Sequence, residues 1–413
     1  MSATTTADYI AAYKEFGIDD YVTYKADLAA DGFQDLKALA ASNLLKATMI
    51  GEEFLMLGGN TSLALGNSPT PTLTQSNSGG VLLGNTGFGV GVVTLTLDGL
   101  RRAALAGGVI QSYTRTNGDG TTDSMNGGLG RPSTQANVAT ANDAANLHSI
   151  NATCNAVAGA VAYAWFWGAN ASNLTLGAIT TINSVLITAN ATGTSVAPGT
   201  ANFAALGATD NSTDSLIFDG LLTFAFNASL NSYQAVMATG NAGTGTPLTA
   251  DAAGGVNEID TALKSFWDNY RLSPSKIWVS SQEMKNITKA VLKGSSTSAA
   301  RFVVEVKDQG MLGGGFMVRS YLNKYSMDGA TEIPIKIHPN LPAGVILFDT
   351  DELPYPMSNV ANVKQMRMRR DYYQVDWPQV KRRYEFGVYA DGVMQHFFPP
   401  AIGVIYNIAD GLL

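Results

Sequence analysis

The sequence predicts an α+β protein whose chain is interrupted by an inserted all-β module, and three observations carry this prediction. Residues 258–292 have the pattern of a helix, a strand and a second helix, whereas residues 367–408 have mostly the pattern of strands. Residues 61–250, in contrast, contain no Lys, no Glu and only eleven charged side chains, four Arg and seven Asp. A change of surface chemistry this sharp indicates a module inserted into a more ordinary host.

The composition favours a protein whose surface is covered by neighbours. A chain of 413 residues is too long for one ordinary core, so two or three domains are expected. Charged residues make up only 14% of the chain, against about 25% in typical globular domains, and so few charges make a monomer prone to association. The net charge of −7 excludes a general nucleic-acid coat, because such a coat needs a basic balance to neutralise phosphates.

Neither a disulfide nor a membrane anchor is predicted. Cys154 is the only cysteine, so no intrachain disulfide is expected, and its strand-like surroundings favour a small buried side chain over a nucleophile. The residues that follow Met1 have neither the positive nor the apolar region of a signal peptide. No stretch reaches the roughly 18 uninterrupted apolar residues that a membrane-spanning helix needs.

The first predicted element is a long amphipathic helix within residues 25–57. Apolar side chains recur at the three-and-four spacing of a helix from Leu36 to Leu57, and we place its start near Phe33. Residues 58–60, Gly-Gly-Asn, provide a stop signal.

The inserted module, residues 62–213 with a core at about 85–200, has the pattern of a β-sandwich. It begins with a loop rich in Pro, Gly, Ser, Thr and Asn and continues as short strands separated by turns. Trp165 and Trp167 alternate with Phe166, so one face of a strand carries both indoles, and we expect them in the sandwich core rather than in a carbohydrate-stacking platform. Strands are expected within 90–99, 109–116, 148–168 and 176–189.

The host resumes at about residue 214. Its second helix begins after a polar residue, and Ser281 is the predicted N-cap. The predicted elements are a buried strand or turn, a helix, a strand, a second helix and two strands around a Pro-rich turn, at 215–226, 258–270, 276–281, 281–292 and 333–356.

No cluster of residues in the sequence points to catalysis. The three histidines, His148, His338 and His396, are far apart, and none has a second His or a Cys at ligand spacing, so no zinc site is predicted. No G-x-S-x-G elbow and no phosphate-binding loop occur. Residues 117–128 favour a hairpin turn over a calcium loop, whose spacing and final Glu they lack. We therefore predict no enzyme, no catalytic residue, no metal and no cofactor.

The most charged stretch, 364–383, interleaves seven basic side chains with aromatic ones. Such a mixture can bind single-stranded nucleic acid, and it is also typical of protein interfaces. Because the chain is acidic overall, we favour inter-subunit ion pairs and stacking over DNA binding.

Taken in order, the host segments resemble the Hong Kong 97-type capsid fold of tailed bacteriophages. The helix that ends in EEFLMLGGN resembles the spine helix of that family, and IFDGLL at 217–222 resembles the glycine-containing segment that follows it. The helix–strand–helix of 258–292 resembles the axial domain, and 370–408 resembles the closing strands of the peripheral domain. The resemblance covers a little over half of the chain, and its specificity comes from the order of the motifs.

This resemblance implies a major capsid protein with a peripheral and an axial domain, and the chain departs from the family in two places. The long insertion stands where the family has a short link, and we interpret it as an immunoglobulin-like or fibronectin-like sandwich that projects from the shell. Few residues precede the spine helix, so the family's extended hairpin, the E-loop, is either shortened or lies upstream. The implied parts are an N-terminal arm, the spine helix, the insertion, the axial domain and the return strands, at 1–24, 25–61, 62–213, 214–330 and 331–413.

The function that the resemblance implies is mechanical. Many copies form the hexamers and pentamers of an icosahedral phage head that encloses double-stranded DNA without sequence-specific contact. The implied partners are the chain itself, a portal, a scaffold and a cementing or decoration protein, and the implied location is the virion, assembled in the host cytoplasm, with no membrane involved. Two alternatives stay open, a surface-binding decoration or adhesin module and a cargo-enclosing nanocompartment shell of the same fold.

Candidate inter-subunit contacts follow from the same resemblance. They combine arginines of the tail with acidic side chains as partners, and they are Glu52, Glu53, Arg367, Arg369, Arg370, Asp371, Arg382, Arg383 and Glu385. Reversal of Arg382 and Arg383 to Glu is predicted to block assembly while the monomer still folds.

Overall fold

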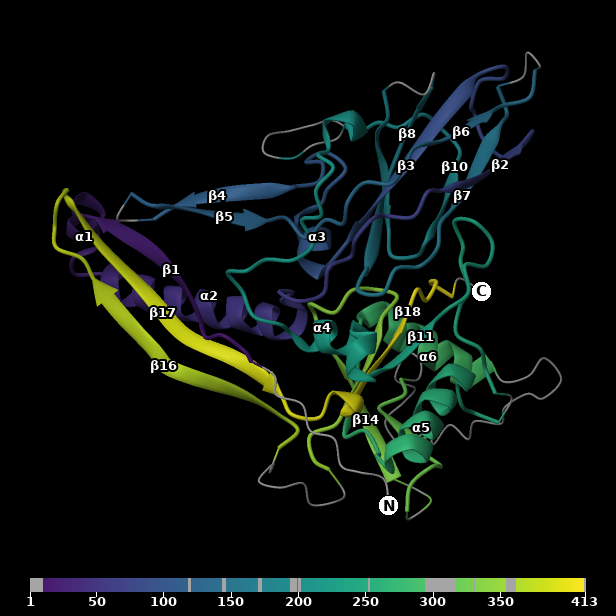
Figure 1. Ribbon diagram of the computed structural model, residues 1–413. Helices are drawn as coiled ribbons and strands as arrows, with labels where there is room; N and C mark the ends of the chain where they lie inside the picture. The colour runs from purple at the N-terminus through teal and green to yellow at the C-terminus, as the bar shows by residue number, and fades with distance from the viewer. Residues whose placement is uncertain are drawn as a thin grey trace, which may run out of the picture.

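The computed structural model describes residues 10–411 except 118–119, 143–145, 170–172, 194–198, 200–201, 252, 294–316, 328, 330 and 354–361. Three parts meet in it: a long helix with a three-stranded ribbon, a β-sandwich, and a six-stranded sheet flanked by helices (Figure 1). The chain is therefore α+β, as the sequence predicts.

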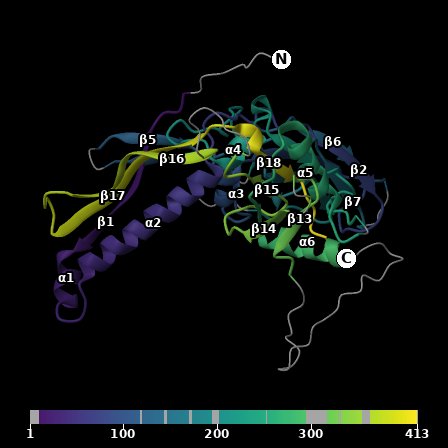
Figure 2. The same ribbon diagram turned by 90° about the horizontal axis from the view of Figure 1, so that it is seen from below.

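The first part is an elongated arm, in which a helix lies along an antiparallel ribbon of strand order β1-β17-β16 (Figure 2). Asp35 caps the helix, because its carboxylate accepts from the backbone N–H of Ala38 at 3.0 Å. Val22, Leu44 and Phe386 share a small core with Val388, so the first and last parts of the chain fold together. The elements are β1 (Lys14–Thr23), α1 (Tyr24–Ala30), α2 (Leu36–Gly58), β16 (Lys364–Asp376) and β17 (Arg383–His396).

The helix was thus predicted correctly, apart from its start, whereas β1 was not predicted as a strand. Within the described residues, β1 and α1 are the elements that precede α2. β1 pairs with β17 over its whole length, from Lys14 opposite Gly392 to Thr23 opposite Arg383.

The second part is a sandwich of two antiparallel sheets, with strand orders β6-β3-β8-β9 and β10-β7-β2. Trp165 and Trp167 lie in the core between the sheets, as predicted, whereas Phe166 packs on the opposite face of β8. The indole N–H of Trp165 donates to Thr180 Oγ1 at 2.8 Å, so its polar edge is satisfied. The strands are β2 (Thr72–Ser76), β3 (Gly87–Leu95), β6 (Ala136–Ala139), β7 (Ser149–Thr153), β8 (Ala162–Ala169), β9 (Thr175–Thr180) and β10 (Ser184–Ile187).

The immunoglobulin-like or fibronectin-like order that we expected for this sandwich is not observed. Numbered along the described part of the insertion, the seven strands of the two sheets have the orders 3-2-5-6 and 7-4-1. An immunoglobulin constant domain places strands 1-2-5-4 in one sheet and 3-6-7 in the other. The central pair of strands 2 and 5 is shared, but strands 3 and 6 flank that pair here, whereas strands 1 and 4 flank it in the immunoglobulin domain and lie in the other sheet here. Alternating apolar residues set which face of each strand is buried, and they do not set which strands are neighbours.

Two further pieces belong to the insertion. A hairpin of β4 and β5 leaves the sandwich and extends toward the arm (Figure 1). A short helix begins at Thr96, whose hydroxyl accepts from the backbone N–H of Gly99 at 3.3 Å. These pieces are α3 (Leu97–Arg102), β4 (Ser112–Thr116), β5 (Thr122–Asn126) and the 3₁₀ turn η1 (Phe203–Ala205).

The third part is a mixed sheet of order β11-β18-β15-β12-β14-β13. The helices α5 and α6 cover one face, and α4 with the end of α2 covers the other. Its elements are α4 (Leu221–Phe226), η2 (Ala228–Leu230), β11 (Tyr233–Val236), α5 (Asn257–Tyr270), β12 (Lys276–Val279), α6 (Ser281–Lys293), β13 (Ser320–Asn323), β14 (Thr331–Ile337), β15 (Ile346–Asp349), η3 (Pro399–Ala401) and β18 (Ile402–Tyr406).

Two predictions about this part were wrong. Residues 221–226, within the segment predicted as strand or turn, form the helix α4. The cap of α6 is Ser280 and not Ser281, because the Ser280 hydroxyl accepts from the backbone N–H of Glu283 at 3.2 Å.

The insertion leaves the host and returns to it at one point, where two glycines touch. The N–H of Gly220 donates to the carbonyl of Gly59 at 2.8 Å. A Cβ on Gly59 would lie 2.2 Å from the carbonyl oxygen of Phe218, and one on Gly220 would lie 2.6 Å from that of Leu55. Only glycine permits this approach. The domain bounds proposed from the sequence stay a prediction.

A shared core and a pair of asparagines join the three parts. Phe54, Leu97 and Val404 come from α2, the insertion and β18, and they lie in one buried cluster. Asn407 and Asn183 exchange hydrogen bonds, since Asn407 Oδ1 accepts from the N–H of Asn183 at 2.8 Å and Asn407 Nδ2 donates to Asn183 Oδ1 at 3.0 Å. The sandwich is therefore fixed to the host by buried contacts as well as by its two connections.

Candidate subunit interface

The ribbon has one covered face and one open face. Even-numbered residues of β1, such as Phe16 and Val22, point toward α2. The other face carries Tyr373, Trp377 and Tyr389, whose ring centroids lie 6.0 Å (Tyr373–Tyr389) and 6.2 Å (Trp377–Tyr389) apart. An aromatic surface of this kind is typical of the buried centre of protein interfaces.

The basic residues predicted on β16 lie along an edge of this ribbon. Arg367, Arg369 and Arg370 are exposed, as is Asp371. Arg369 forms an ion pair with Asp391 of β17. The guanidinium of Arg370 lies over the ring of Tyr373, 3.5 Å from its centroid, an attractive cation–π arrangement. The strand therefore presents positive charge to solvent, although part of that charge is balanced within the chain.

The candidates Arg382, Arg383 and Glu385 lie at the outer end of the ribbon. Arg383 forms an ion pair with Glu385, so Glu385 has a partner within its own chain. Arg383 also lies 4.5 Å from the ring centroid of Tyr21. Arg382 is exposed, and its guanidinium lies 5.8 Å from the ring centroid of Tyr24.

The two acidic candidates on α2 also have partners within the chain. Glu52 accepts a hydrogen bond from the hydroxyl of Tyr372. Burial raises the pKa of Glu52 above its usual value, and the nearby carboxylate of Asp371 raises it further. Glu53 Oε1 lies 3.2 Å from Nε2 of His338. The structure brings Glu52 and Asp371 together, but as neighbours of like charge and not as an ion pair.

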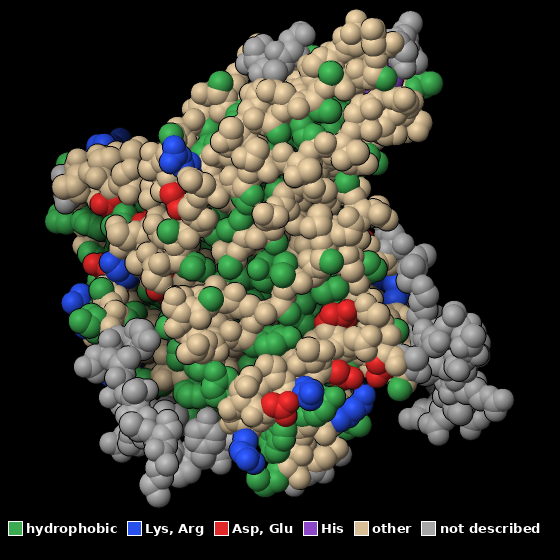
Figure 3. Space-filling model, turned by 45° about the vertical axis from the view of Figure 1, so that its right-hand side comes forward, with side chains coloured by type: hydrophobic (Ala, Val, Ile, Leu, Met, Phe, Trp, Pro, Cys, Tyr) green, Lys and Arg blue, Asp and Glu red, His purple; other side chains and the backbone are tan. Residues whose placement is uncertain are grey.

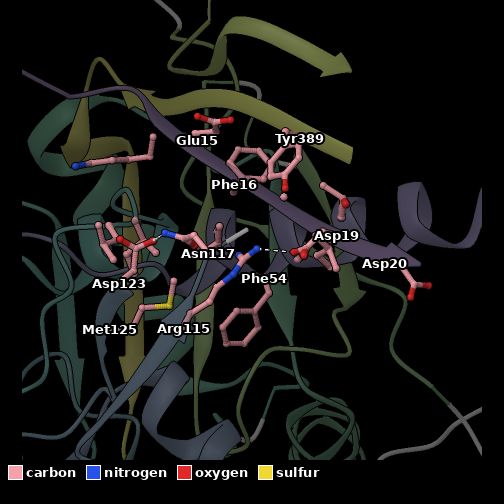
Figure 4. Close-up of a pocket in the computed structure, with 18 of the residues that line it drawn as sticks. Glu15, Phe16, Asp19, Asp20, Phe54, Arg115, Asn117, Asp123, Met125 and Tyr389 are labelled. Atoms are coloured by element: carbon pink, nitrogen blue, oxygen red, sulfur yellow. Dashed lines mark hydrogen bonds and ion pairs between the residues drawn. The ribbon is translucent and has the colours of Figure 1, made fainter. Parts of the chain in front are cut away.

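A broad groove of about 1520 Å³ separates β1 and α2 from the hairpin β4–β5 (Figure 4). Asp19 of β1 and Arg115 of β4 bridge it with an ion pair of 2.7 Å. On the hairpin, Asn117 Nδ2 donates to Asp123 Oδ2 at 2.9 Å. Residues 13–21 line the groove consecutively, so β1 borders it along most of its length.

The outer end of the arm exposes apolar side chains that sequence reasoning did not single out. Phe33 is 93% exposed and Val380 is 87% exposed, and Leu28 is also largely exposed. Leu28 and Phe33 belong to α1 and the turn after it, and the start of α1 is joined to the turn between β16 and β17, because the N–H of Tyr24 donates to the carbonyl of Arg382 at 3.1 Å. Exposed apolar groups at a tip indicate a contact surface.

The remaining titratable candidates are buried. Desolvation raises the pKa of the Cys154 thiol to about 12, which suits a structural side chain. Burial, helped by Lys364, lowers the pKa of His396 to about 3. Among the described residues, no three His, Cys, Asp or Glu side chains gather where they could hold a metal ion. None of the helices in the described ranges combines the length and apolarity that crossing a bilayer requires.

The charge asymmetry read from the sequence is visible on the surface. On the face shown in Figure 3, Lys, Arg, Asp and Glu side chains are sparse over the upper part of the molecule, where the sandwich lies, and more frequent below it.

Comparison with known proteins places the chain in no family. No protein-family model matches it, and no curated protein matches it. Among solved structures, it is similar to a holo-SrpI encapsulin complex from Synechococcus elongatus PCC 7942, at 14% sequence identity and a TM-score of 0.24. The match covers 47% of this chain and 57% of the encapsulin chain, which is less than two thirds of that chain's length. A TM-score this low does not establish a common fold.

Proposed function

We propose that this chain is a structural subunit, many copies of which assemble into a closed shell, and that the shell is the head of a tailed bacteriophage. One observation carries the proposal. The long helix α2 lies along a ribbon built from the first and last parts of the chain, and the chain then continues into β18, which lies between β11 and β15 in the helix-flanked sheet. The first and last thirds of the sequence thus form a single platform that extends outward as an arm (Figure 2).

The order and type of these elements support the Hong Kong 97-type resemblance. The helix α2 corresponds to the spine helix, and β1, β16 and β17 to the peripheral domain. The elements α5, β12 and α6, with their sheet, correspond to the axial domain. In this proposal, the axial parts meet around the axes of hexamers and pentamers, and the arms contact neighbouring subunits.

The way the arm is covered supports a role in assembly. One helix covers one face of a three-stranded ribbon, so the aromatic open face and the apolar tip remain in contact with solvent in the single chain. Phe33 and Val380 are examples at the tip. Burial of such groups contributes roughly 25 cal/mol per Å², and a neighbouring subunit would supply that burial.

The proposal assigns roles to the other parts. The sandwich lies beside the platform and away from the arm (Figure 1), and we propose that it projects from the shell, where a cementing or decoration protein can bind it. The enclosed double-stranded DNA is held without sequence-specific contact, since the chain carries a net charge of −7. The chain acts without catalysis, together with a portal and a scaffold, and its location is the virion after assembly in the host cytoplasm.

Electron microscopy of the purified protein tests the proposal. Uniform hollow particles are the expected result. Of the two charge reversals, at Arg382 and at Arg383, Arg382→Glu is the clearer test. Arg382 is exposed, whereas Arg383 also forms an ion pair with Glu385, which its reversal would break. The Arg382→Glu variant is expected to fold and to form no particles. Arg131→Glu, the same charge change on an exposed residue of the insertion, is the matched control and is expected to assemble normally.

Two results would contradict the proposal: wild-type protein that forms no particles, or Arg382→Glu particles as numerous and regular as those of Arg131→Glu. The content of purified particles separates a phage head from a nanocompartment. Double-stranded DNA in particles from the natural source favours the phage head, and an enclosed protein without DNA favours the cargo-enclosing shell.

A further inference from the structure

The two edges of the ribbon carry opposite charge. The edge strand β1 has one basic and three acidic side chains, a net charge of −2, from Lys14, Glu15, Asp19 and Asp20. The other edge strand, β16, has four basic and two acidic side chains, a net charge of +2, from Lys364, Arg367, Arg369, Arg370, Asp371 and Asp376. The ribbon therefore has an acidic edge and a basic edge.

Both edges are unpaired in the single chain. Each strand pairs with β17 on its inner side. In the described part of the chain, neither strand has another strand on its outer side. A long unpaired edge is a surface on which another chain can dock. The groove runs beside β1 along residues 13–21, and the ion pair of Asp19 with Arg115 crosses it.

Some of the edge charges are already used within the chain, and others are not. Asp19 pairs with Arg115 and Arg369 pairs with Asp391. Asp20 and Arg367 are exposed and form no ion pair among the described residues. Each edge therefore keeps at least one charge of its own sign that only another molecule can neutralise.

The signs of these charges decide which edges can meet. Two copies of the basic edge side by side would bring Arg367 and Arg370 of both copies together, and like charges at an interface cost free energy. Two copies of the acidic edge would repel in the same way through Glu15 and Asp20. A contact of unlike edges, in contrast, is complementary, and it is head-to-tail, the kind that closes into rings when the rotation allows it.

We propose that the acidic β1 edge of one subunit binds the basic β16 edge of a second copy of this chain. The inference rests on the proposed function and names the contact by which neighbouring arms join. Side-chain charges carry the contact more than a continuous backbone ladder does. The register of β16 shifts between Met368 and Arg370 and again between Arg370 and Tyr373, and such bulges interrupt the row of backbone groups that a new strand would need.

Charge reversal of each edge, alone and combined, tests this contact. The first variant, Glu15→Lys with Asp20→Lys, makes both edges basic. The second, Arg367→Glu with Arg370→Glu, makes both edges acidic. Each variant alone is expected to yield at least tenfold less assembled protein than the wild type in sedimentation, while its circular dichroism spectrum and melting temperature stay near those of the wild type.

Two complementation experiments make the test specific. An equimolar mixture of the two variants is expected to associate into species larger than either variant forms alone, because each basic edge then finds an acidic one on the other variant, and alternating subunits close rings with an even number of members. The fourfold variant, which carries all four substitutions and the same net charge as the wild type, is also expected to assemble. Higher salt is expected to weaken assembly in every case, because salt screens exposed charges.

The outcomes separate this inference from the proposed function. If both charge-reversed variants assemble as well as the wild type, the inference is wrong and the shell proposal stands. If both remain folded but neither the mixture nor the fourfold variant assembles, the edges do not meet in this way. Wild-type protein that never assembles overturns the shell proposal and the edge contact with it.

Discussion

The sandwich and the ribbon differ in how completely they bury their apolar and aromatic side chains. In the sandwich, Tyr163, Trp165 and Phe166 of one strand are at most 1% exposed, since two sheets and their loops enclose them. In the ribbon, α2 covers only one face, so Tyr21 at 51% and Val380 at 87% remain exposed. The sandwich has a core that is complete within one chain. The ribbon is a surface that a neighbouring molecule can complete.

The charges follow the same division. Four Arg and seven Asp are the only charged side chains among residues 61–250, and the sandwich is held by apolar burial. The ribbon carries opposite charges on its two edges, and several of them form ion pairs within the chain. Exposed ion pairs add little stability, but their pattern sets which partners fit. The side chains of the sandwich thus mainly stabilise the fold, whereas the charges of the ribbon mainly determine which partner can bind it.

The largest expected effect on stability compares an aromatic residue in each part. Trp165→Ala is expected to lower the free energy of unfolding by about 3–5 kcal/mol, because it leaves a cavity and removes the hydrogen bond to Thr180. Tyr389→Ala on the open face of the ribbon is expected to cost about 1 kcal/mol, mainly its ring contacts. Urea denaturation followed by circular dichroism measures both. Equal losses would contradict the division between a complete core and an open surface.

The next effect concerns the joint between the sandwich and the host. Asn407→Ala is expected to lower the free energy of unfolding by about 1–3 kcal/mol, because Asn183 loses buried partners. Asn407 also has a φ of +64°. The matched variant Asn407→Gly tolerates that backbone conformation, so it is expected to be more stable than Asn407→Ala by about 1 kcal/mol. Thermal unfolding of both variants measures the difference. If neither variant is less stable than the wild type, this joint does not hold the parts together.

A smaller effect depends on pH and concerns the helix-flanked sheet. Burial raises the pKa of Glu283 from 4.5 to about 7, although Asn286 and the N–H of Gly344 donate hydrogen bonds to its carboxylate. The folded protein therefore binds a proton that the unfolded chain has lost between pH 4.5 and pH 7. The contribution of Glu283 to stability is full below pH 4.5 and is lost as the pH rises through 7, by up to about 1.4 kcal/mol per pH unit.

Glu283→Gln removes this titration and keeps a neutral acceptor in place. Between pH 5 and pH 8, the stability of the variant relative to the wild type is expected to rise. The difference between the two proteins isolates Glu283, because His396 titrates in both, and its lowered pKa changes stability with pH in the opposite sense. Urea midpoints at both pH values measure the difference, and parallel pH profiles would contradict the assignment.

The smallest expected effect concerns how much an exposed ion pair contributes to the free energy of unfolding. Lys264 and Asp268 lie 3.8 Å apart on α5, and their side chains are 60% and 56% exposed. Loss of this pair in Lys264→Ala is expected to change the free energy of unfolding by no more than about 0.5 kcal/mol. A loss several times larger, measured by the same urea denaturation, would mean that exposed ion pairs contribute substantially to the stability of this protein.

Local signals in the sequence predicted most helices and strands, including α2, α5 and both tryptophans of β8. The strand β1 was missed, although Phe16, Ile18 and Val22 already show alternation, because no turn signal separates it from the helix that follows. The helix α4 could not be predicted from its six residues, five of them apolar, since such a run suits a strand equally well. Its position is fixed by residues far away in the sequence, for example by the hydrogen bond from Thr223 to the carbonyl of Gly59 at 2.6 Å.

The sequence predicted where the candidate interface lies, but it did not predict which charges pair with one another there. The basic stretch does lie on an exposed strand, which the sequence pattern indicated. The partners of its charges were not predictable, because Arg369 meets Asp391 only through the register of β16 against β17. The acidic edge opposite was also missed, since it depends on β1 joining the same sheet from the other end of the chain.

Sedimentation velocity of the purified wild-type chain shows whether it is a shell subunit. The monomer has a mass of 43.4 kDa, and we expect a concentration-dependent conversion of this species into uniform closed particles of many copies, which the charge-reversed ribbon variants do not form. A chain that sediments as a monomer at every concentration and salt condition, with its ribbon intact, would mean that the ribbon does not join subunits into a shell.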